Sequence, residues 1–256
     1  MAGSDAVIEQ FSAAAAGYAT STVHAAGPDL PLLVEAAAPS AGEVALDIGT
    51  GAGHAAFALA PHVREVTAVD ITEAMLEEAR KGASSRGLGN VRFEQGDAQA
   101  LPYGDESFDI VTCRVSAHHF AFPGRFVAEA ARVLRPGGRF VLVDTIAPED
   151  AALDTFSNAI ELLRDRSHVR NWSAAQWLSM MAPAGLEGEV LHRSGYVLHG
   201  PSWVQRMHTP EANVAVIRKL FAEATPAQRR YFEIREEPWG WTVPYAIVRG
   251  VRRDEG

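Results

Sequence analysis

The chain has 256 residues, 47% of them hydrophobic, and a formal net charge of −9. This length lets one α/β domain bury a large core without disulfides or metal ions, and the single cysteine, Cys113, excludes a disulfide framework and the usual cysteine zinc sites. The net negative charge and the scattered basic residues disfavour a nucleic-acid partner. Because the sequence has neither the basic start of a secretory signal nor an apolar run of membrane length, we expect a cytoplasmic protein.

The chain begins with two predicted helices and continues with alternating strands and helices. Apolar residues at a spacing of three to four predict helices over residues 5–22 and 29–38. Short apolar runs rich in β-branched residues predict strands, with helices over 73–85 and 124–134 between them. The predicted strands are Val44–Ile48, Val66–Asp70, Val91–Gln95, Phe108–Cys113 and Arg139–Asp144. Such alternation is typical of a parallel sheet with helices on both faces, whose ligands bind at the carboxyl ends of the strands.

The pattern changes after Asp144. Residues 148–181 are predicted to be helical, 186–192 to form a strand, 202–231 to form further helices, and 242–252 to form a last strand. No linker is long enough to indicate a second independent domain. We therefore interpret residues 147–232 as a lid on the sheet.

The first predicted strand carries an acid at its end and leads into three glycines at alternate positions. In the segment Asp47-Ile48-Gly49-Thr50-Gly51-Ala52-Gly53, the third glycine comes one residue too early for the dinucleotide motif Gly-x-Gly-x-x-Gly. A carboxylate this close to the turn would also repel a pyrophosphate. The turn suits a ligand with a nucleoside half and a cationic group for Asp47 to face, and S-adenosyl-L-methionine has both. The alternative is an ordinary strand-to-helix turn that binds nothing.

Acids also follow the second and third predicted strands. Asp70 comes 21 residues after Gly49, the distance at which an acid reaches a ribose bound over the first turn. Asp97 could accept a hydrogen bond from an exocyclic adenine amine, while Ile71 and Met75 could pack on the ring faces. Each acid has a structural alternative, since Asp70 could cap the following helix and Asp97 could belong to a turn.

Six segments between residues 44 and 145 form a series. They are Leu46–Gly53, Val69–Leu76, Gly96–Ala98 with Leu101 and Pro102, Ser107–Asp109, His118–Phe120 and Leu134–Gly138. In order and spacing they resemble the class I S-adenosylmethionine-dependent methyltransferases, in particular the ubiquinone and menaquinone biosynthesis methyltransferases and their small-molecule relatives. The resemblance implies an α/β fold with a Rossmann-like, seven-stranded, mostly parallel sheet, helices on both faces and an antiparallel last strand.

The resemblance also implies one methyltransferase domain over residues 1–256. Its parts would be an N-terminal helical cover (1–39), a cofactor-binding core (40–146), and the lid insertions with the last two strands (147–256). S-adenosyl-L-methionine would be the cofactor, with the three glycines of the turn under its methionine moiety and ribose.

Further roles follow from the resemblance by position. Asp70 would bind the ribose hydroxyls, and Asp97 with Ala98 would bind adenine. The backbone around Arg114 and Val115 would face the methionine ammonium and the methyl group.

The N-terminal helix matches one that covers the cofactor in similar enzymes. Phe11 and Tyr18 would be its covering residues, with core packing as the alternative for both. The complete set of predicted cofactor-binding residues is Phe11, Tyr18, Asp47, Gly49, Thr50, Gly51, Gly53, Asp70, Ile71, Met75, Gly96, Asp97, Ala98, Arg114 and Val115.

Methyl transfer is an in-line displacement that needs neither a metal nor a covalent intermediate. A general base helps when the acceptor must lose a proton. His118 and His119 follow the fourth predicted strand and titrate near neutral pH, so they are the candidate catalytic residues. The alternative is a structural pair at a helix entrance. The other histidines lack the spacing of a zinc site, so no metal is expected.

We interpret the sequence as that of a methyltransferase acting on a small organic acceptor that is quinone-like, phenolic or of polyketide type. Two alternatives stay open: an S-adenosylmethionine-binding protein of the same fold that catalyses a cyclisation or rearrangement, and, with less support, a nicotinamide-dependent dehydrogenase. The expected partner is a small-molecule substrate, without nucleic acid and without a membrane span. Self-association as a homodimer stays open.

Overall fold

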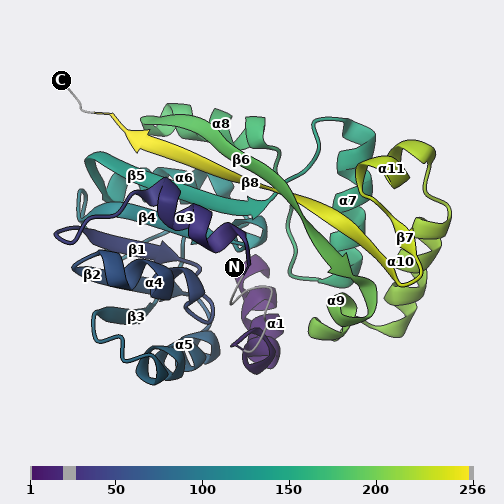
Figure 1. Ribbon diagram of the computed structural model, residues 1–256, viewed down its shortest axis with the longest axis horizontal. Coiled ribbons are helices and arrows are strands. Elements are labelled where there is room, and N and C mark those ends of the chain that lie inside the picture. Colours follow the sequence, from purple (N-terminus) through teal and green to yellow (C-terminus); the bar gives the residue numbers. More distant parts are fainter. Residues whose placement is uncertain (1, 20–26, 254–256) are drawn as a thin grey trace.

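A twisted β-sheet runs through the chain, of which the computed structural model describes residues 2–19 and 27–253. Its strands are β1 (Val44–Ile48), β2 (Glu65–Asp70), β3 (Val91–Gln95), β4 (Phe108–Arg114), β5 (Leu134–Thr145), β6 (Leu186–His199), β7 (Arg235–Glu236) and β8 (Trp239–Arg252). They follow the order β3-β2-β1-β4-β5-β8-β6, and the short β7 pairs with β8 outside this path (Figure 1). β1 to β5 pair in parallel, whereas β8 is antiparallel to β5 and β6. The predicted mostly parallel sheet with an antiparallel last strand is confirmed.

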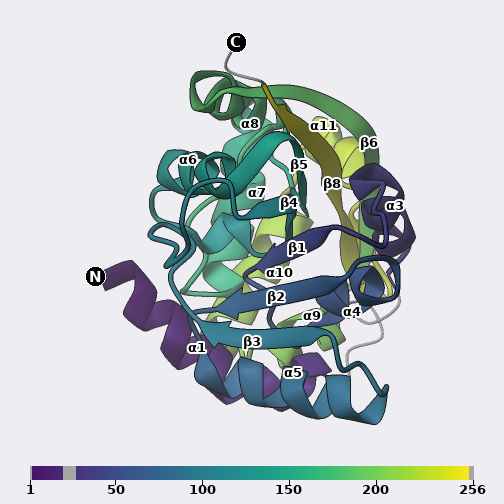
Figure 2. The ribbon, with the colours of Figure 1, turned by 90° about the vertical axis from the view of Figure 1, so that its left-hand side faces the viewer.

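Helices cover both faces of the sheet, as predicted. The helices of the described residues are α1 (Ala2–Ala19), α3 (Asp29–Ala37), α4 (His54–Leu59), α5 (Glu73–Ser85), α6 (Pro123–Val133), α7 (Ala151–Arg164), α8 (Ala174–Met181), α9 (Gly200–Arg206), α10 (Glu211–Ala222) and α11 (Pro226–Tyr231). α3 and α4 pack on one face, α6 and α8 pack on the other, and α1 lies beside α5 (Figure 2). In the described part of the chain, no helix is long and apolar enough to cross a membrane.

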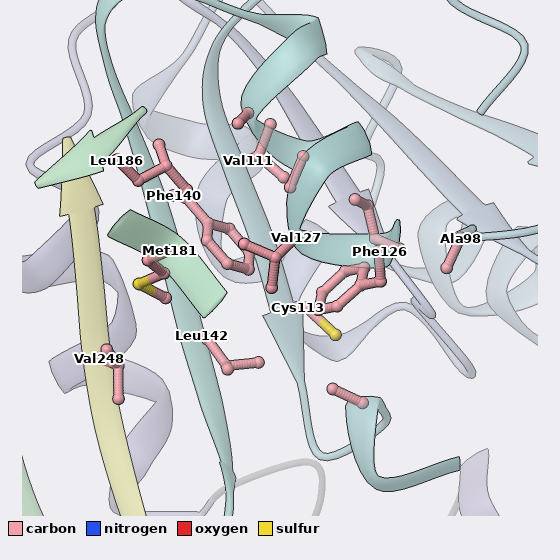
Figure 3. Packing of buried hydrophobic residues seen from close by; sticks show 14 of the residues in the cluster. Ala98, Val111, Cys113, Phe126, Val127, Phe140, Leu142, Met181, Leu186 and Val248 are labelled. Atoms are coloured by element: carbon pink, nitrogen blue, oxygen red, sulfur yellow. The ribbon is translucent and has the colours of Figure 1, made fainter. Parts of the chain in front are cut away.

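The larger core lies between the sheet and the helices α6 and α8. Alternation along β1 sends Leu46 and Ile48 to this face and Ala45 to the opposite one. Figure 3 shows Phe126 of α6 packed beside β4 and β5, with Met181 of α8 farther along the same layer. Each large side chain that is fully buried in this way stabilises the fold by about 1.5–3 kcal/mol. This packing holds the strand ends, and the turns that follow them, in fixed positions.

The predicted boundaries agree closely with the structure in the first half of the chain. β1, β3 and α5 have the predicted ends, and Gly87 follows α5 at φ +67°, the left-handed conformation that glycine tolerates. β5 begins earlier than predicted because Leu134 already pairs with Phe108, before the irregularity between Phe108 and Ile110. The predicted helix over 124–134 therefore ends one residue earlier, at Val133.

The region predicted to be helical over residues 148–181 consists of two helices, α7 and α8. Ser173 begins α8 through a capping box, in which its hydroxyl accepts from the backbone of Gln176 and the Gln176 side chain accepts from the backbone N–H of Ser173. In the loop between the helices, the backbone N–H of Val169 donates to the carbonyl of His118 at 3.0 Å. The loop is thereby fixed beside the 3₁₀ turn that follows β4.

β6 and β8 are each 14 residues long and extend past the parallel strands (Figure 1). The strand predicted over 186–192 was too short, because pairing with β8 continues to His199 opposite Gly240. Around the extended ends, α7, α9 and α10 pack on a separate core that includes Trp203 and Trp241. We call the unit of α7, α9, α10, α11 and β7, with the adjoining ends of β6 and β8, the cap. Because β8 is antiparallel to β5, the cap lies beyond the carboxyl end of β5, the edge at which such sheets bind ligands.

Candidate functional site

The carboxyl ends of β1, β2 and β4 surround a cavity of about 1050 Å³, counted with its open mouth, which we call the first cavity. It gathers thirteen of the predicted cofactor-binding residues: Phe11, Asp47, Gly49, Thr50, Gly51, Asp70, Ile71, Met75, Gly96, Asp97, Ala98, Arg114 and Val115. Gly53 does not line it. Tyr18 belongs to α1, but its side chain lies outside the described residues.

The glycine turn brings backbone close to the first cavity. Gly49 and Gly51 have φ values of +63° and +53°, a region that side-chain-bearing residues rarely adopt. A Cβ at Gly49 would lie 2.2 Å from the Oγ of Ser116, so only glycine fits there. Gly53 serves a different purpose: it precedes α4 at φ +89°, and a Cβ there would lie 2.5 Å from the ring of Phe57.

Asp47 lies at the floor of the first cavity with 1% of its surface exposed. Its Oδ2 accepts from the hydroxyl of Thr50 and its Oδ1 from the hydroxyl of Thr112, each at 2.7 Å. Burial raises the pKa of Asp47 to about 6 although both hydrogen bonds favour the charged form. A cation bound next to Asp47 would favour its ionised form, so the site is suited to a positively charged ligand.

Asp70 and Asp97 line the same cavity and also organise the turns that carry them. The carboxylate of Asp70 accepts from the backbone N–H of Gly51 at 2.8 Å and of Thr72 at 2.9 Å, and burial raises its pKa. Asp97 accepts from the backbone N–H of Gln99 at 2.9 Å. Asp97 thus belongs to a turn, as its structural alternative had it, whereas Asp70 does not cap α5, because it bonds the N–H of the N-cap residue Thr72 and no N–H inside the helix. Both acids line the cavity.

A second cavity of about 690 Å³ lies beside the first. The two share Phe11, Arg114, Val115 and His119, which form the junction between them. The rest of the second cavity is lined by strand ends, the loop after α7 and the cap: His118, Thr145, Glu161, Arg164, Asn171, Tyr196, Leu198, Trp203, Arg206 and Val243. Of the two predicted catalytic histidines, His119 thus lies at the junction and His118 in the second cavity.

His118 is held by the carboxylate at the end of β5. Nδ1 of His118 lies 2.7 Å from Oδ1 of Asp144, and the backbone N–H of His118 donates to the other oxygen at 3.0 Å. Asp144 is 1% exposed and also accepts from the backbone N–H of Thr145 at 2.8 Å. Burial works to lower the pKa of His118, but the charge and hydrogen bond of Asp144 outweigh it, so this pKa lies above its usual value. With Nδ1 bonded to Asp144, Nε2 is the ring nitrogen left for the second cavity.

Two more imidazoles lie close to His118. The ring centroid of His119 is 4.2 Å from that of His118, and the ring of His168 is 5.6 Å away. Burial, together with the charge of His118, lowers the pKa of His119 to about 4 and that of His168 to about 2. These shifts favour the uncharged form of His119 and His168 and the charged form of His118. Among the described residues, no group of three or more His, Cys, Asp or Glu could hold a metal ion.

Sequence reasoning missed several residues of the site. The Arg114 side chain, for which only the backbone was predicted to matter, forms a buried ion pair with Asp29, with Nε 2.5 Å from Oδ2. Thr112 points from β4 to Asp47 and has no sequence signal. Asp144 could have been found, because it follows an apolar run at the carboxyl end of a parallel strand, where ligand-binding residues gather.

Residues 46–142 match the family described as a methyltransferase domain. The chain is 40% identical over 247 residues to the uncharacterized methyltransferase YcgJ of Bacillus subtilis. The aligned residues cover 95% of this chain and 98% of that protein. The crystal structure of the YcgJ protein matches with a TM-score of 0.85 and 38% identity, over 88% of this chain and 98% of the other. The chain therefore belongs to the S-adenosylmethionine-dependent methyltransferases. The predicted cofactor and enzyme class are confirmed.

Two relatives with named substrates match over part of their length. The demethylmenaquinone methyltransferase of Deinococcus radiodurans is 45% identical over 106 residues, or 40% of this chain and 43% of that protein. The 27-O-demethylrifamycin SV methyltransferase of Amycolatopsis mediterranei is 34% identical over 168 residues, or 64% of this chain and 61% of the other. The chain is thus similar to enzymes that methylate small molecules.

Proposed function

We propose that the protein transfers a methyl group from S-adenosylmethionine to a quinone-like, phenolic or polyketide-type acceptor bound in the second cavity. The observation that carries this proposal is the shared wall of the two cavities. Phe11, Arg114, Val115 and His119 line both, so a methyl group presented at the junction would face an acceptor on the other side. Displacement requires the attacking atom at about 3–3.5 Å from the methyl carbon, and two adjoining cavities favour such an approach.

The first cavity fits the cofactor chemically. Its glycine turn leaves no room for a Cβ at Gly49, as expected where backbone approaches a ligand closely, and its acids suit a cationic nucleoside. Asp70 would accept from the ribose hydroxyls, Asp97 from the adenine amine, and Asp47 would face the ammonium directly or through water. S-adenosylmethionine would supply a methyl carbon on a positively charged sulfur, and that sulfur leaves as a neutral thioether.

The rest of the first cavity supplies shape and the approach to the methyl group. Ile71 and Met75 would pack on the adenine ring, and the backbone of Arg114 and Val115 would lie next to the methionine moiety. Phe11 of α1 would close the junction, because its ring meets that of His119 edge-on, with the centroids 5.0 Å apart.

His118 would act as the general base on the acceptor. Because Asp144 accepts from Nδ1, the tautomer with a free lone pair on Nε2 is favoured, and the carboxylate stabilises the imidazolium that forms. Asp144 is then a positioning residue that raises the basicity of His118. His119, with its lowered pKa, would shape the junction as a neutral ring.

Release of S-adenosylhomocysteine during incubation with a panel of hydroquinones, phenols and polyketide aromatics tests the proposal. We expect turnover with at least one member and its loss in His118→Ala at unchanged cofactor affinity. Tight cofactor binding without release from any acceptor would instead favour the non-methylating alternative, a cyclisation or rearrangement on the same fold.

A further inference from the structure

His118 and His119 each bond to the protein through one ring nitrogen, Nδ1, and leave the other, Nε2, open. Nδ1 of His118 bonds to Asp144, and Nδ1 of His119 bonds to Ser167. Among the described residues no group bonds to either Nε2, and neither atom belongs to the fully buried side-chain atoms that lack a partner. Both residues line the second cavity, so each Nε2 is accessible to a ligand bound there.

Ser167 fixes the ring proton of His119 on Nδ1. This nitrogen lies 3.0 Å from the carbonyl oxygen of Ser167 and 3.3 Å from its hydroxyl oxygen. A carbonyl oxygen can only accept, and the hydroxyl donates its single proton to Oδ1 of Asp165 at 2.6 Å. Both oxygens of Ser167 therefore accept from Nδ1. In the uncharged ring of His119, Nε2 then carries a lone pair and no proton.

The two rings differ in how readily they take up a proton. Burial works to lower the pKa of His118, but the charge and hydrogen bond of Asp144 raise it above its usual value. Burial and the charge of His118 lower the pKa of His119 to about 4, and the nearby charge of Asp165 offsets only part of this effect. His118 is thus suited to remove a proton from a ligand, whereas His119 is suited to accept a hydrogen bond and leave the proton where it is.

The two imidazoles are also neighbours in the cavity wall. Their ring centroids lie 4.2 Å apart, and their planes are inclined by 46°. A ligand that donates to both Nε2 atoms must therefore carry its two donors on neighbouring positions. Apolar side chains complete this part of the wall: Phe11 meets the ring of His119 edge-on, and Leu198, Trp203 and Val243 line the same cavity. Such a wall suits an aromatic ring as the frame that carries the donors.

We propose that His119 is a specificity-determining residue, and that the acceptor is an aromatic compound with hydroxyl groups on two neighbouring carbons. This inference rests on the proposed methyl transfer. One hydroxyl gives its proton to Nε2 of His118, and its oxygen forms the new bond to the methyl carbon while the carbon–sulfur bond breaks and the sulfur keeps its electron pair. The neighbouring hydroxyl keeps its proton and donates a hydrogen bond to Nε2 of His119. The products are the monomethyl ether, S-adenosylhomocysteine and a protonated His118 that returns its proton to water.

The same arrangement limits the reaction to one methyl group per acceptor. In the monomethyl ether, the ether oxygen can only accept a hydrogen bond. If the remaining hydroxyl bonds to His118, this ether oxygen faces the lone pair on Nε2 of His119, and neither atom can donate. The product therefore binds less tightly than the acceptor from which it was formed.

Binding of four matched probes tests the role of His119 without turnover. The probes are 2,3-dihydroxynaphthalene, its isomer 2,7-dihydroxynaphthalene with the hydroxyls far apart, 2-naphthol with one hydroxyl, and 3-methoxy-2-naphthol. Each is titrated by calorimetry into the full-length protein saturated with S-adenosylhomocysteine, with a chelator present because neighbouring hydroxyls also bind metal ions. We expect 2,3-dihydroxynaphthalene to bind about tenfold more tightly than the other three, because only it donates to both imidazoles.

Two variants of His119 separate its two nitrogens. In His119→Asn the side-chain amide can replace Nδ1 and donate to Ser167, but nothing replaces Nε2. In His119→Gln the longer side chain can place its carbonyl oxygen where Nε2 was, and the bond to Ser167 is lost. We expect His119→Asn to bind 2,3-dihydroxynaphthalene about as weakly as 2-naphthol, and His119→Gln to recover most of the difference. A purely structural role predicts the opposite order, because only the Asn variant keeps the bond to Ser167.

His168→Gln is the control, because His168 belongs to the same group of imidazoles but lines neither cavity. It should leave the preference for 2,3-dihydroxynaphthalene unchanged.

The outcomes separate this inference from the proposed function. Equal affinity of the wild-type protein for the two dihydroxynaphthalenes overturns the inference, and so does a His119→Asn variant that binds the 2,3-isomer at least as tightly as His119→Gln does. If another acceptor is methylated and the 2,3-isomer is not preferred, the inference is wrong and the methyl transfer stands. If the 2,3-isomer binds as expected but no acceptor releases S-adenosylhomocysteine, the proposed function fails, and the inference that rests on it fails as well.

Discussion

The first and second cavities differ in how their charged groups are held. In the first, Asp47, Asp70 and Asp97 accept hydrogen bonds from the turns beside them, so the cavity is shaped before a ligand arrives. In the second, charged groups from separate elements pair with each other, His118 with Asp144 and Arg114 with Asp29. Turns that fix their own acids suit one constant ligand, whereas ionisable groups held between separate elements suit selection among acceptors. We infer that the two halves of the site are under different physical constraints, so that a substitution in one half should leave the other largely unchanged.

The largest expected effect falls on the second cavity alone. His118→Ala removes the proton acceptor and should lower kcat about 10²–10⁴-fold, the range found for general bases, in stopped-flow or steady-state assays with a methylated acceptor. The affinity for S-adenosylmethionine, measured by calorimetry, should stay within about twofold because His118 does not line the first cavity. His119→Ala is the matched comparison, and its loss should be smaller since its lowered pKa keeps it from taking a proton. Full activity in both variants would show that neither ring is the base.

The next effect falls on the first cavity alone. Asp70→Ala removes the proposed ribose acceptor and leaves the backbone N–H groups of Gly51 and Thr72 without their partner. We expect a loss of roughly hundredfold in affinity for S-adenosylmethionine by calorimetry, since two hydrogen bonds to a charged group are lost. The control is Glu73→Ala, which removes an exposed acid at the start of α5 that does not line the cavity, and it should change nothing measurable. Unchanged affinity in Asp70→Ala would remove the ribose assignment.

The two cavities also differ in how well the sequence predicts the residues that line them. The wall of the first cavity comes mostly from short segments that follow β1, β2, β3 and β4. The first three of these strand ends carry an acid or a glycine, so local chemistry was enough to expect Asp47, Asp70 and Asp97 at one cavity. The second cavity is assembled from residues as distant as Phe11 and Val243, which meet only after the sheet and the cap have formed. Side-chain pairs of that kind leave no periodicity or spacing in the sequence.

The features that the sequence did not predict correctly also depend on contacts between distant segments. The 14-residue length of β6 depends on pairing with β8, so a local pattern showed only its first half, and Tyr196 was consequently not placed. The loop that carries Asn171 was hidden inside a predicted helix although its capping box, Ser173 with Gln176, is written in the sequence. Thr112 needs the register of β1 and β4 to be known before it can be linked to Asp47.

A smaller effect tests how the second cavity tunes its base. Asp144→Asn removes the charge that holds the pKa of His118 above its usual value. His118 accepts a proton only when neutral, so kcat/KM of the wild-type enzyme should rise with pH through that pKa, and the rise should move to lower pH in the variant. The plateau should also fall, by about tenfold, since the imidazolium loses its stabilising partner. A lower plateau with an unmoved pH profile would mean that Asp144 serves the fold rather than the base.

The smallest effect lies at the floor of the first cavity and concerns Asp47. Its pKa is raised by burial to about 6, above the unfolded value, so the free protein gains stability from the protonated carboxyl below the unfolded pKa and loses it as the pH rises through about 6. A cationic ligand reverses that preference, because it interacts with the ionised carboxylate. Affinity for S-adenosylmethionine should therefore rise between pH 5 and pH 7 by about tenfold and then level off, with proton release detectable by calorimetry in buffers of different ionisation enthalpy.

Asp47→Asn isolates this effect, because the amide keeps the size of the side chain and its neighbours Thr50 and Thr112 can reorient their hydroxyls. Affinity in the variant should lose the rise between pH 5 and pH 7 that Asp47 causes, and any slope that remains belongs to Asp70, whose pKa is also raised by burial. An unchanged rise in Asp47→Asn would mean that the cation of the ligand does not face this carboxylate. The first cavity would then bind its ligand through the nucleoside half alone, and selectivity for a charged sulfur would have to come from the junction with the second cavity.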